Sequence, residues 1–312
     1  MFCAWKIFRR GKTAKNDVMD FEMNLEDNIF SLCEEVKNNA YRHSSYTHFQ
    51  IFDNKKRDIY KAEVKDRIIH QIIYDYLLSL FNPSFIADSY ASRIYKGQYK
   101  AIDTFRYFIK LVGNSHYEYY VLKCDVRKYF DNVDHEVLFN MIKEKVSCER
   151  ILEIIQEIIS SFHSGDIMQK GIPLGNITSQ IFANIYLNTL DQYVKKELRC
   201  RFYVRYNDDI VIVFHNNKDI ENVRDKVISF VKEKLYLEIP LNKTSIRKIS
   251  WGVDFLGFTI LPEAVLLRDK TKHKIYSNIN IKNANSYLSI LGHCNSHNLK
   301  AKILSMGKLY EI

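Results

Sequence analysis

The chain of 312 residues is 46% hydrophobic and 27% charged, so it can bury a sizeable core, and a wholly disordered chain is excluded. The formal net charge of +9 is concentrated at the two ends, since residues 1–16 hold five basic and no acidic side chains and residues 266–312 hold eight basic against two acidic ones. Such basic ends suit either ordinary solvated surface or a protein that holds a polyanion. No apolar run approaches the roughly 18 residues of a membrane helix, and no signal-peptide pattern opens the chain, so we expect a cytoplasmic protein with no membrane partner.

The first third of the chain is predicted to be mainly helical. Apolar residues recur at three- and four-residue steps, and Asn82-Pro83 stops one of the runs. Helices are expected over residues 20–39, 64–81 and 98–112. Residues 46–52 and 57–62 alternate around Asp53-Asn54, which predicts a β-hairpin between the first two helices.

The rest of the chain mixes β-rich runs with amphipathic segments. Strands are expected over residues 119–125, 201–206, 210–214, 244–249 and 254–260. Helices are expected over residues 134–145, 149–162, 178–198 and 218–235. The last forty residues are predicted to form a short β pair followed by two small helices. This order of elements is typical of an α+β protein with an antiparallel sheet and helices on one face.

Three aspartates stand where the predicted strands end. Asp125 closes the run 119–125, and Asp208 and Asp209 occupy the tight turn between the next two strands. Aspartate is common in turns, which explains one such residue, but two adjacent charges beside apolar strands are unfavourable unless a cation offsets them. Three converging carboxylates could hold two Mg²⁺ ions, which favour oxygen ligands and serve phosphoryl transfer.

Two motifs around these aspartates resemble those of one enzyme family. Tyr206-Asn207-Asp208-Asp209 resembles the Tyr-x-Asp-Asp box of reverse transcriptases, and Cys124-Asp125-Val126-Arg127-Lys128-Tyr129-Phe130 resembles their first palm box. The resemblance extends over about residues 50–300 and implies a right-hand polymerase fold. It places an N-terminal extension and fingers at 1–115, a palm at 116–262 with a fingers insertion around 145–175, and a small thumb at 263–312.

The resemblance assigns the chemistry to four positions. Asp125, Asp208 and Asp209, with the Val126 carbonyl, are expected to bind two Mg²⁺ ions, with Mn²⁺ as a substitute. Lys243, in Leu241-Asn242-Lys243-Thr244, matches the lysine that protonates departing pyrophosphate. A lysine in a turn is more commonly just solvated, and that alternative stays open.

Further positions match the family's nucleotide-binding residues. Phe130 stands where an aromatic steric gate favours dNTPs, although a core aromatic is equally compatible with the spacing. Within Lys55-Lys56-Arg57 and Asp66-Arg67, Arg57 and Arg67 are expected to bind the triphosphate, because the planar guanidinium suits phosphate oxygens. Gly175 and Gln180 are expected to line the same nucleotide.

The glycine-bearing box departs from most of the family. Residues 171–180 read Gly-Ile-Pro-Leu-Gly-Asn-Ile-Thr-Ser-Gln, so Leu174 replaces a glutamine, and Ser179-Gln180 replaces Ser-Pro. This variant resembles the enzymes of diversity-generating retroelements, which copy a template RNA with errors at adenines. Leu174, Gly175 and Ser179 would then form the template pocket, where an apolar Leu174 cannot hydrogen-bond the template strand.

The last matching positions concern the nucleic acid itself. Arg93 and Lys96 resemble contacts of the fingers to template and primer, and Phe255-Leu256-Gly257 resembles the hairpin that grips the primer terminus. The expected partners are template RNA, the cDNA or primer, dNTPs and a basic helical-bundle accessory protein.

The sequence therefore predicts an RNA-directed DNA polymerase that makes cDNA by two-metal phosphoryl transfer, error-prone within a diversity-generating retroelement. One alternative is the reverse transcriptase of a phage-defence or group II intron-like element. An alternative of another class is a non-catalytic RNA-binding protein on a polymerase scaffold.

Overall fold

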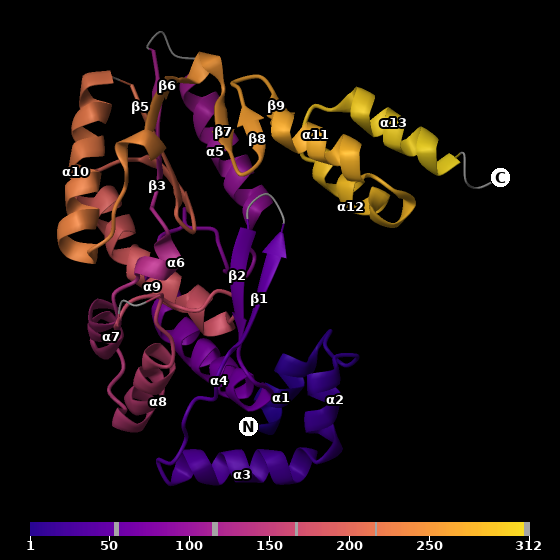
Figure 1. Cartoon of the computed structure of the whole chain (residues 1–312). Helices are drawn as coiled ribbons and strands as arrows, with labels where there is room; N and C mark the ends of the chain where they lie inside the picture. The colour runs from indigo at the N-terminus through magenta and orange to yellow at the C-terminus, as the bar shows by residue number, and fades with distance from the viewer. Residues whose placement is uncertain (53–55, 114–117, 166–167, 216, 309–312) are drawn as a thin grey trace. The chain divides into compact units, whose positions relative to one another are not determined.

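The structure is a computed structural model that describes residues 1–52, 56–113, 118–165, 168–215 and 217–308 (Figure 1). The chain divides into two compact units, each made of separate stretches of sequence. Unit 1 comprises residues 1–86, 127–192 and 230–238, and unit 2 comprises residues 87–126, 193–229 and 239–312. The predicted hairpin turn at Asp53-Asn54, and Lys55, lie outside the described residues.

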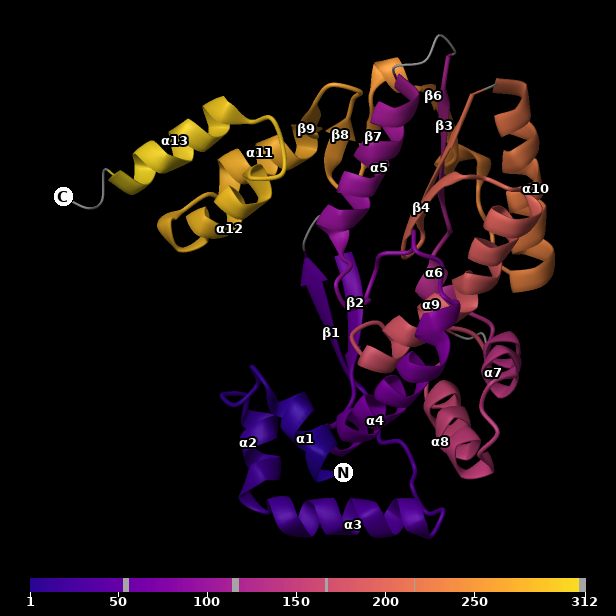
Figure 2. The same ribbon diagram turned by 180° about the vertical axis from the view of Figure 1, so that it is seen from behind.

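Unit 1 is mostly helical and carries one hairpin. Its elements are α1 (Phe2–Arg9), α2 (Asn16–Met23), α3 (Leu25–Lys37), β1 (Thr47–Phe52), β2 (Lys56–Lys61), α4 (Val64–Phe81), α6 (Tyr129–Asn132), α7 (His135–Lys143), α8 (Glu149–Ser160) and α9 (Ile177–Gln192). β1 and β2 pair antiparallel, as the sequence predicts. Helix α4 packs against both α1 and α9, and the α1 contact can be followed in Figure 2.

The burial of α4 explains its central place in unit 1. Ile68, Ile69, Ile73 and Leu77 are each no more than 2% exposed, at the helical spacing that the sequence shows. Burying each such side chain contributes roughly 1.5–3 kcal/mol to stability. The same helix buries Asp66, whose carboxylate accepts hydrogen bonds from the Tyr41 hydroxyl at 2.8 Å and the Ser44 backbone N–H at 3.2 Å.

Unit 2 contains two antiparallel sheets with a helix packed on them. Its elements are α5 (Gln98–Gly113), β3 (Tyr120–Asp125), β4 (Phe202–Tyr206), β5 (Asp209–Phe214), β6 (Ser245–Lys248), β7 (Val253–Phe255), β8 (Phe258–Ile260), β9 (Val265–Leu267), α11 (Asp269–Asn278), α12 (Ile281–Leu291) and α13 (His297–Lys308). The strand orders are β4-β5-β3-β6 and β7-β8-β9. Helix α10 (Asn217–Leu235) has residues in both units.

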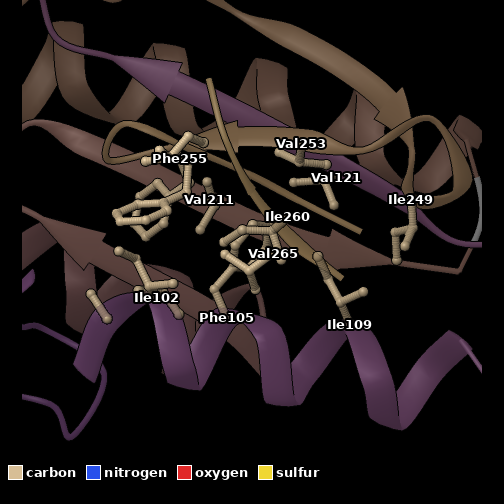
Figure 3. Packing of buried hydrophobic residues seen from close by; sticks show 14 of the residues in the cluster. Ile102, Phe105, Ile109, Val121, Val211, Ile249, Val253, Phe255, Ile260 and Val265 are labelled. Atoms are coloured by element: carbon tan, nitrogen blue, oxygen red, sulfur yellow. The ribbon is translucent and has the colours of Figure 1, made fainter. Parts of the chain in front are cut away.

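The core of unit 2 joins α5 to both sheets. Figure 3 shows Phe105 and Ile109 of α5 pointing toward the strands, where Val121 and Val211 meet them from one sheet and Phe255 from the other. The rings of Phe105 and Phe255 lie edge to face with centroids 5.4 Å apart. This shared core fixes the β7–β9 sheet against the β3–β5 strands within unit 2.

The predicted α+β class is confirmed, while some element boundaries differ. The helix expected over 20–39 is two helices, because Asn24 adopts the non-helical angles φ −123° and ψ 45°. The helix expected over 178–198 is α-helical only as far as Gln192, and Tyr193–Glu197 form a π-helical turn. No helix among the described residues is long and apolar enough to cross a membrane.

The prediction for the C-terminal part was wrong in two respects. The run 254–260 is not one strand, because Leu256 and Gly257 both have positive φ, 48° and 88°, and form a two-residue turn between β7 and β8. Gly257 is the signal of this turn in the sequence, and it was overlooked between the apolar residues Leu256 and Phe258. The β pair expected at the start of the last forty residues is not there, because β9 ends at Leu267 and α11 occupies Asp269–Asn278; the two helices expected after it are α12 and α13.

Candidate functional site

Strand register in unit 2 brings the three predicted aspartates together. Asp125, the last residue of β3, is the direct antiparallel partner of Asp209, the first residue of β5. Tyr206 pairs with Asp209, so Asn207 and Asp208 alone form the β4–β5 turn, with Asn207 at φ 51°. Residues paired in this way have Cβ atoms roughly 4.5–5.5 Å apart. The register therefore sets Asp125 beside Asp209, with Asp208 next to them in the turn.

The clustering perturbs Asp208. Burial, followed by the nearby charges of Asp125 and Asp209, raises the pKa of Asp208 to about 6, and Lys243 opposes the rise. A raised pKa means that the negatively charged form of Asp208 is disfavoured in this environment. The cluster is thus the kind of site that gains from a bound cation.

Two lysines supply positive charge to the carboxylates. The Lys243 ammonium, on the short 3-10 turn Leu241–Lys243 (η3), lies 2.7 Å from Asp125 Oδ1. The Lys123 ammonium lies 3.5 Å from Asp209 Oδ1. Like charges directly opposite each other destabilise an antiparallel pair, so these lysines offset part of the repulsion. Lys243, the predicted proton donor, is in direct contact with a predicted metal ligand.

In unit 1 the glycine-bearing loop is held on strand β2. The Tyr60 N–H donates to the Leu174 carbonyl at 2.9 Å, and Asn176 Nδ2 donates to the Tyr60 carbonyl at 2.8 Å. Gly175 has φ +118°, and a Cβ built on it would lie 2.8 Å from Ile59 Cγ2. Both the conformation and the close approach therefore require glycine at this position.

The glycine-bearing loop is also held by a hydrogen bond from Ser179 and by one to the Phe130 carbonyl. Ser179 is 1% exposed, and its hydroxyl donates to the Pro173 carbonyl at 2.7 Å, so this side chain fixes the loop rather than facing a ligand. The Ile172 N–H donates to the Phe130 carbonyl at 2.8 Å. Phe130 is half-buried, and Gln180 is exposed at the start of α9. Within unit 1, a hydrogen bond therefore connects Phe130 to the loop that carries the predicted template pocket.

A family model described as "Reverse transcriptase (RNA-dependent DNA polymerase)" matches residues 32–260, well over half of the chain. The chain belongs to this family. The matched range includes the three carboxylates, the glycine-bearing loop and the β1–β2 hairpin, so the reverse transcriptase resemblance of the motifs and the geometry of the fold agree.

Relatives of the chain include several intron-encoded proteins. It is 21% identical over 305 residues to group II intron-encoded protein LtrA of Lactococcus lactis subsp. cremoris, covering 75% of this chain and 50% of that protein. It is 23% identical over 246 residues to protein YkfC of Escherichia coli K12, covering 67% and 64%. It is 21% identical to the putative COX1/OXI3 intron 2 protein of Saccharomyces cerevisiae, covering 73% and 33%. The chain therefore spans about a third to two thirds of these relatives.

Solved structures with a similar fold include telomerases. Telomerase from Candida albicans, solved with a fragment of telomeric RNA, is 14% identical with a TM-score of 0.56, covering 86% of this chain and 55% of that one. A truncated apo telomerase from Candida tropicalis is 16% identical with a TM-score of 0.54, covering 77% and 60%. At this level of identity the likeness shows the polymerase fold.

The donor set of this reverse transcriptase fits a hard divalent cation. Asp125, Asp208 and Asp209 offer carboxylate oxygens, which Mg²⁺ prefers, and burial together with the charges of Asp125 and Asp209 raises the pKa of Asp208. Across the described residues, no three His, Cys, Asp or Glu side chains already stand in a metal-binding arrangement. Val126, whose carbonyl is the further predicted ligand, is fully buried directly after Asp125.

The two predicted triphosphate arginines have different surroundings. Arg57 is exposed on β2, opposite Ile51 of β1. Arg67 is 15% exposed at its side chain, pairs with the Asp17 carboxylate of α2 and lies over the Phe8 ring at 4.9 Å. Arg67 is thus partnered by the N-terminal helices, and the structure does not bring it together with Arg57.

The predicted nucleic-acid contacts of unit 2 also differ among themselves. Arg93 Nη1 donates to the Ser89 carbonyl at 3.0 Å, and Lys96 Nζ donates to the Ala87 carbonyl at 2.7 Å, so both side chains hold their own loop. Phe255 is fully buried, and its ring is a core residue rather than a surface for a primer. Leu256 and Gly257 form the turn itself, as described above.

Sequence reasoning missed one residue that supports the aspartate turn. Arg205 is 1% exposed, and its Nη1 donates to the Asn207 carbonyl at 3.3 Å. A buried arginine beside the turn is unusual, since charged side chains are buried only when they are paired. The signal in the sequence was an arginine between Val204 and Tyr206 in an otherwise apolar strand.

Proposed function

We propose that this reverse transcriptase is an RNA-directed DNA polymerase that extends a DNA primer on a template RNA with dNTPs. The observation that carries the proposal is the register pairing of Asp125 with Asp209 beside the Asp208 turn. Membership of the family and similarity to LtrA support it. A non-catalytic RNA-binding protein would gain nothing from three converging carboxylates.

The chemistry follows from what these residues can hold. Asp125, Asp208 and Asp209, with the Val126 carbonyl, would bind two Mg²⁺ ions, or Mn²⁺, which when bound activate the attacking hydroxyl and stabilise the leaving pyrophosphate. Lys243, whose ammonium donates to Asp125 Oδ1 at 2.7 Å, would donate a proton to the departing group. These roles remain proposals for this chain.

The substrate contacts are proposed on the remaining positions. Arg57, Gly175 and Gln180 would bind the dNTP, and Phe130 would exclude a ribose 2′-hydroxyl. Arg67 would join them only by leaving the Asp17 carboxylate with which it is paired. Arg93 and Lys96, with the turn at Leu256-Gly257 that follows the buried Phe255, would contact primer and template. In this assignment the fingers are residues 1–115, the palm 116–262 and the thumb 263–312.

Primer extension with Asp208→Asn and Asp209→Asn combined tests the proposal. We expect synthesis to fall by at least about 10³-fold, because the substitution removes the charge that holds the ions. Asp219→Asn, which removes an exposed carboxylate from α10, is the matched control and should extend primers like the parent. Unchanged synthesis by the double variant would overturn the assignment and favour the RNA-binding alternative.

For the subclass, we propose the mutagenic branch of diversity-generating retroelements. Leu174 with Ser179-Gln180 supports it, since an apolar Leu174 offers no hydrogen bond to a template strand. A basic helical-bundle accessory protein and a cytoplasmic location belong to this proposal. Sequencing cDNA made in vitro tests it, because the proposal expects errors concentrated at template adenines.

A group II intron-like or phage-defence reverse transcriptase is the second candidate. The similarity to LtrA and to the yeast intron 2 protein favours the intron-like form. Errors spread evenly over all four template bases would favour this candidate over the mutagenic one.

A further inference from the structure

Lys123 is a lysine on the inner face of a central strand. It lies on β3, with Val121 and Asp125 on the same face two residues away on either side. Val121 belongs to the buried core of unit 2, and the Lys123 side chain is 24% exposed. A lysine in such a place is uncommon unless its ammonium has partners.

The ammonium has two partners from different sheets. It lies 3.5 Å from Asp209 Oδ1 on β5 and donates to the Asp254 carbonyl on β7 at 3.0 Å. One side chain therefore joins a predicted metal ligand to the first strand of the β7–β8 hairpin. Lys243, by contrast, contacts Asp125 from an exposed 3-10 turn.

Asp254 extends this connection through the hairpin. Its Oδ1 accepts from the Thr259 hydroxyl of β8 at 2.7 Å, and its Oδ2 lies 2.9 Å from Arg268 Nε, just before α11. Gln98 Nε2 of α5 donates to the Leu256 carbonyl at the hairpin turn at 2.8 Å. The hairpin is thus rigid at the place where Lys123 holds it.

We propose that Lys123 is a positioning residue that fixes the distance between the Asp209 carboxylate and the β7–β8 hairpin. This inference rests on the proposed function, in which the hairpin grips the primer terminus and Asp209 binds a metal ion. Lys123 holds both to one point of β3, so the primer end keeps its place relative to the carboxylates. It also lowers the negative potential at the site before a metal ion binds.

A simple stabilising ion pair would behave differently. Partly exposed pairs contribute about 0–1 kcal/mol to stability, and their loss leaves chemistry elsewhere unaffected. Lys248 provides such a pair in the same sheet, since it contacts Glu118 at 2.7 Å from the edge strand β6. Lys248→Met is therefore the matched control for Lys123→Met.

The test combines metal binding and kinetics on the full chain. Mn²⁺ binding to the enzyme without nucleic acid is measured by electron paramagnetic resonance for the parent, Lys123→Met, Lys123→Arg and Lys248→Met. For Lys123→Met we expect the Mn²⁺ Kd to fall by about threefold or more, because a competing cation is gone. We expect kcat to fall by about tenfold with the KM for dNTP within about twofold, because the primer end loses its position.

The remaining outcomes decide the proposal. Lys123→Arg should restore the Mn²⁺ Kd to within about twofold of the parent, since it keeps the charge. Tighter Mn²⁺ binding by Lys123→Met with unchanged kcat would overturn the claim that Lys123 positions the β7–β8 hairpin. A lower kcat with unchanged Mn²⁺ binding would overturn the contact between Lys123 and the Asp209 carboxylate. Behaviour of Lys123→Met like that of Lys248→Met would show a merely structural role. If Asp208→Asn/Asp209→Asn still extends primers, the proposed function fails instead.

Discussion

The two units of this reverse transcriptase position their candidate residues by different means. In unit 2, the pairing of β3 with β5 sets Asp125 opposite Asp209, so backbone ladders place the carboxylates. In unit 1, a loop fastened to β2 places Leu174 and Gly175, and the fastening depends on side chains such as Asn176. A strand register tolerates changes in single side chains, whereas a loop of this kind depends on each of its contacts.

The substitution expected to lower stability most is Gly175→Ala, in the loop of unit 1. Gly175→Ala in unit 1 combines a strained φ of +118° with a Cβ 2.8 Å from Ile59 Cγ2. We expect the free energy of unfolding to fall by about 2–5 kcal/mol, with a large loss of primer extension. Urea unfolding and primer extension measure the two effects.

Gly97→Ala in unit 2 is the matched control. Gly97 has almost the same φ, +115°, but a Cβ there would meet nothing within 4 Å. It should lose about 1–2 kcal/mol from strain alone. Adding Ile59→Ala to Gly175→Ala should recover part of the loss, and equal losses at the two glycines would refute the close-approach explanation.

The second effect concerns the carboxylates of unit 2 in metal-free buffer. The pKa of Asp208 is raised to about 6, so its protonated form stabilises the fold below its unfolded pKa near 4, and this contribution is lost as the pH rises through 6. It amounts to at most about 3 kcal/mol. The free energy of unfolding of the parent should therefore fall between pH 4 and 7 relative to that of Asp208→Asn.

Asp219→Asn, at an exposed position of α10, should keep the pH dependence of the parent. Parallel stability curves for the parent and Asp208→Asn would mean that neither burial nor the neighbouring carboxylates raise the pKa of Asp208 in solution.

The third prediction concerns Ser179 in unit 1, where a smaller change in stability is expected. Ser179→Ala removes the 2.7 Å hydrogen bond from the Ser179 hydroxyl to the buried Pro173 carbonyl. We expect the free energy of unfolding to fall by about 1 kcal/mol. Ser277→Ala on α11 of unit 2 also removes a hydroxyl bond to a carbonyl, that of His273, but at an exposed position. It should change stability by less than about 0.5 kcal/mol. Equal effects would show that Ser179 does not fasten the loop.

The same contrast explains which features the sequence could predict. The β-rich runs of unit 2 are short, nearly continuous stretches of β-branched and aromatic residues that end at aspartates, so the meeting of Asp125 with Asp208 and Asp209 was predictable. The contact of Arg67 with Asp17 joins residues 50 positions apart and leaves no local pattern. The turn at Leu256-Gly257 was hidden because Leu is not a turn residue, and its positive φ is set by packing on the core.

The smallest expected effect on stability is that of Leu174→Gln, which should instead change the fidelity of synthesis. The Leu174 backbone is held by the Tyr60 N–H, so exchange of its half-exposed side chain should change the free energy of unfolding by less than about 0.5 kcal/mol. A glutamine could hydrogen-bond the template strand, and the error rate at template adenines should fall, as cDNA sequencing would show. Leu304→Gln, on exposed α13, should leave the error spectrum unaltered. An identical spectrum for Leu174→Gln would mean that base selection is set elsewhere, and the loop of unit 1 would then be a structural support rather than the source of fidelity.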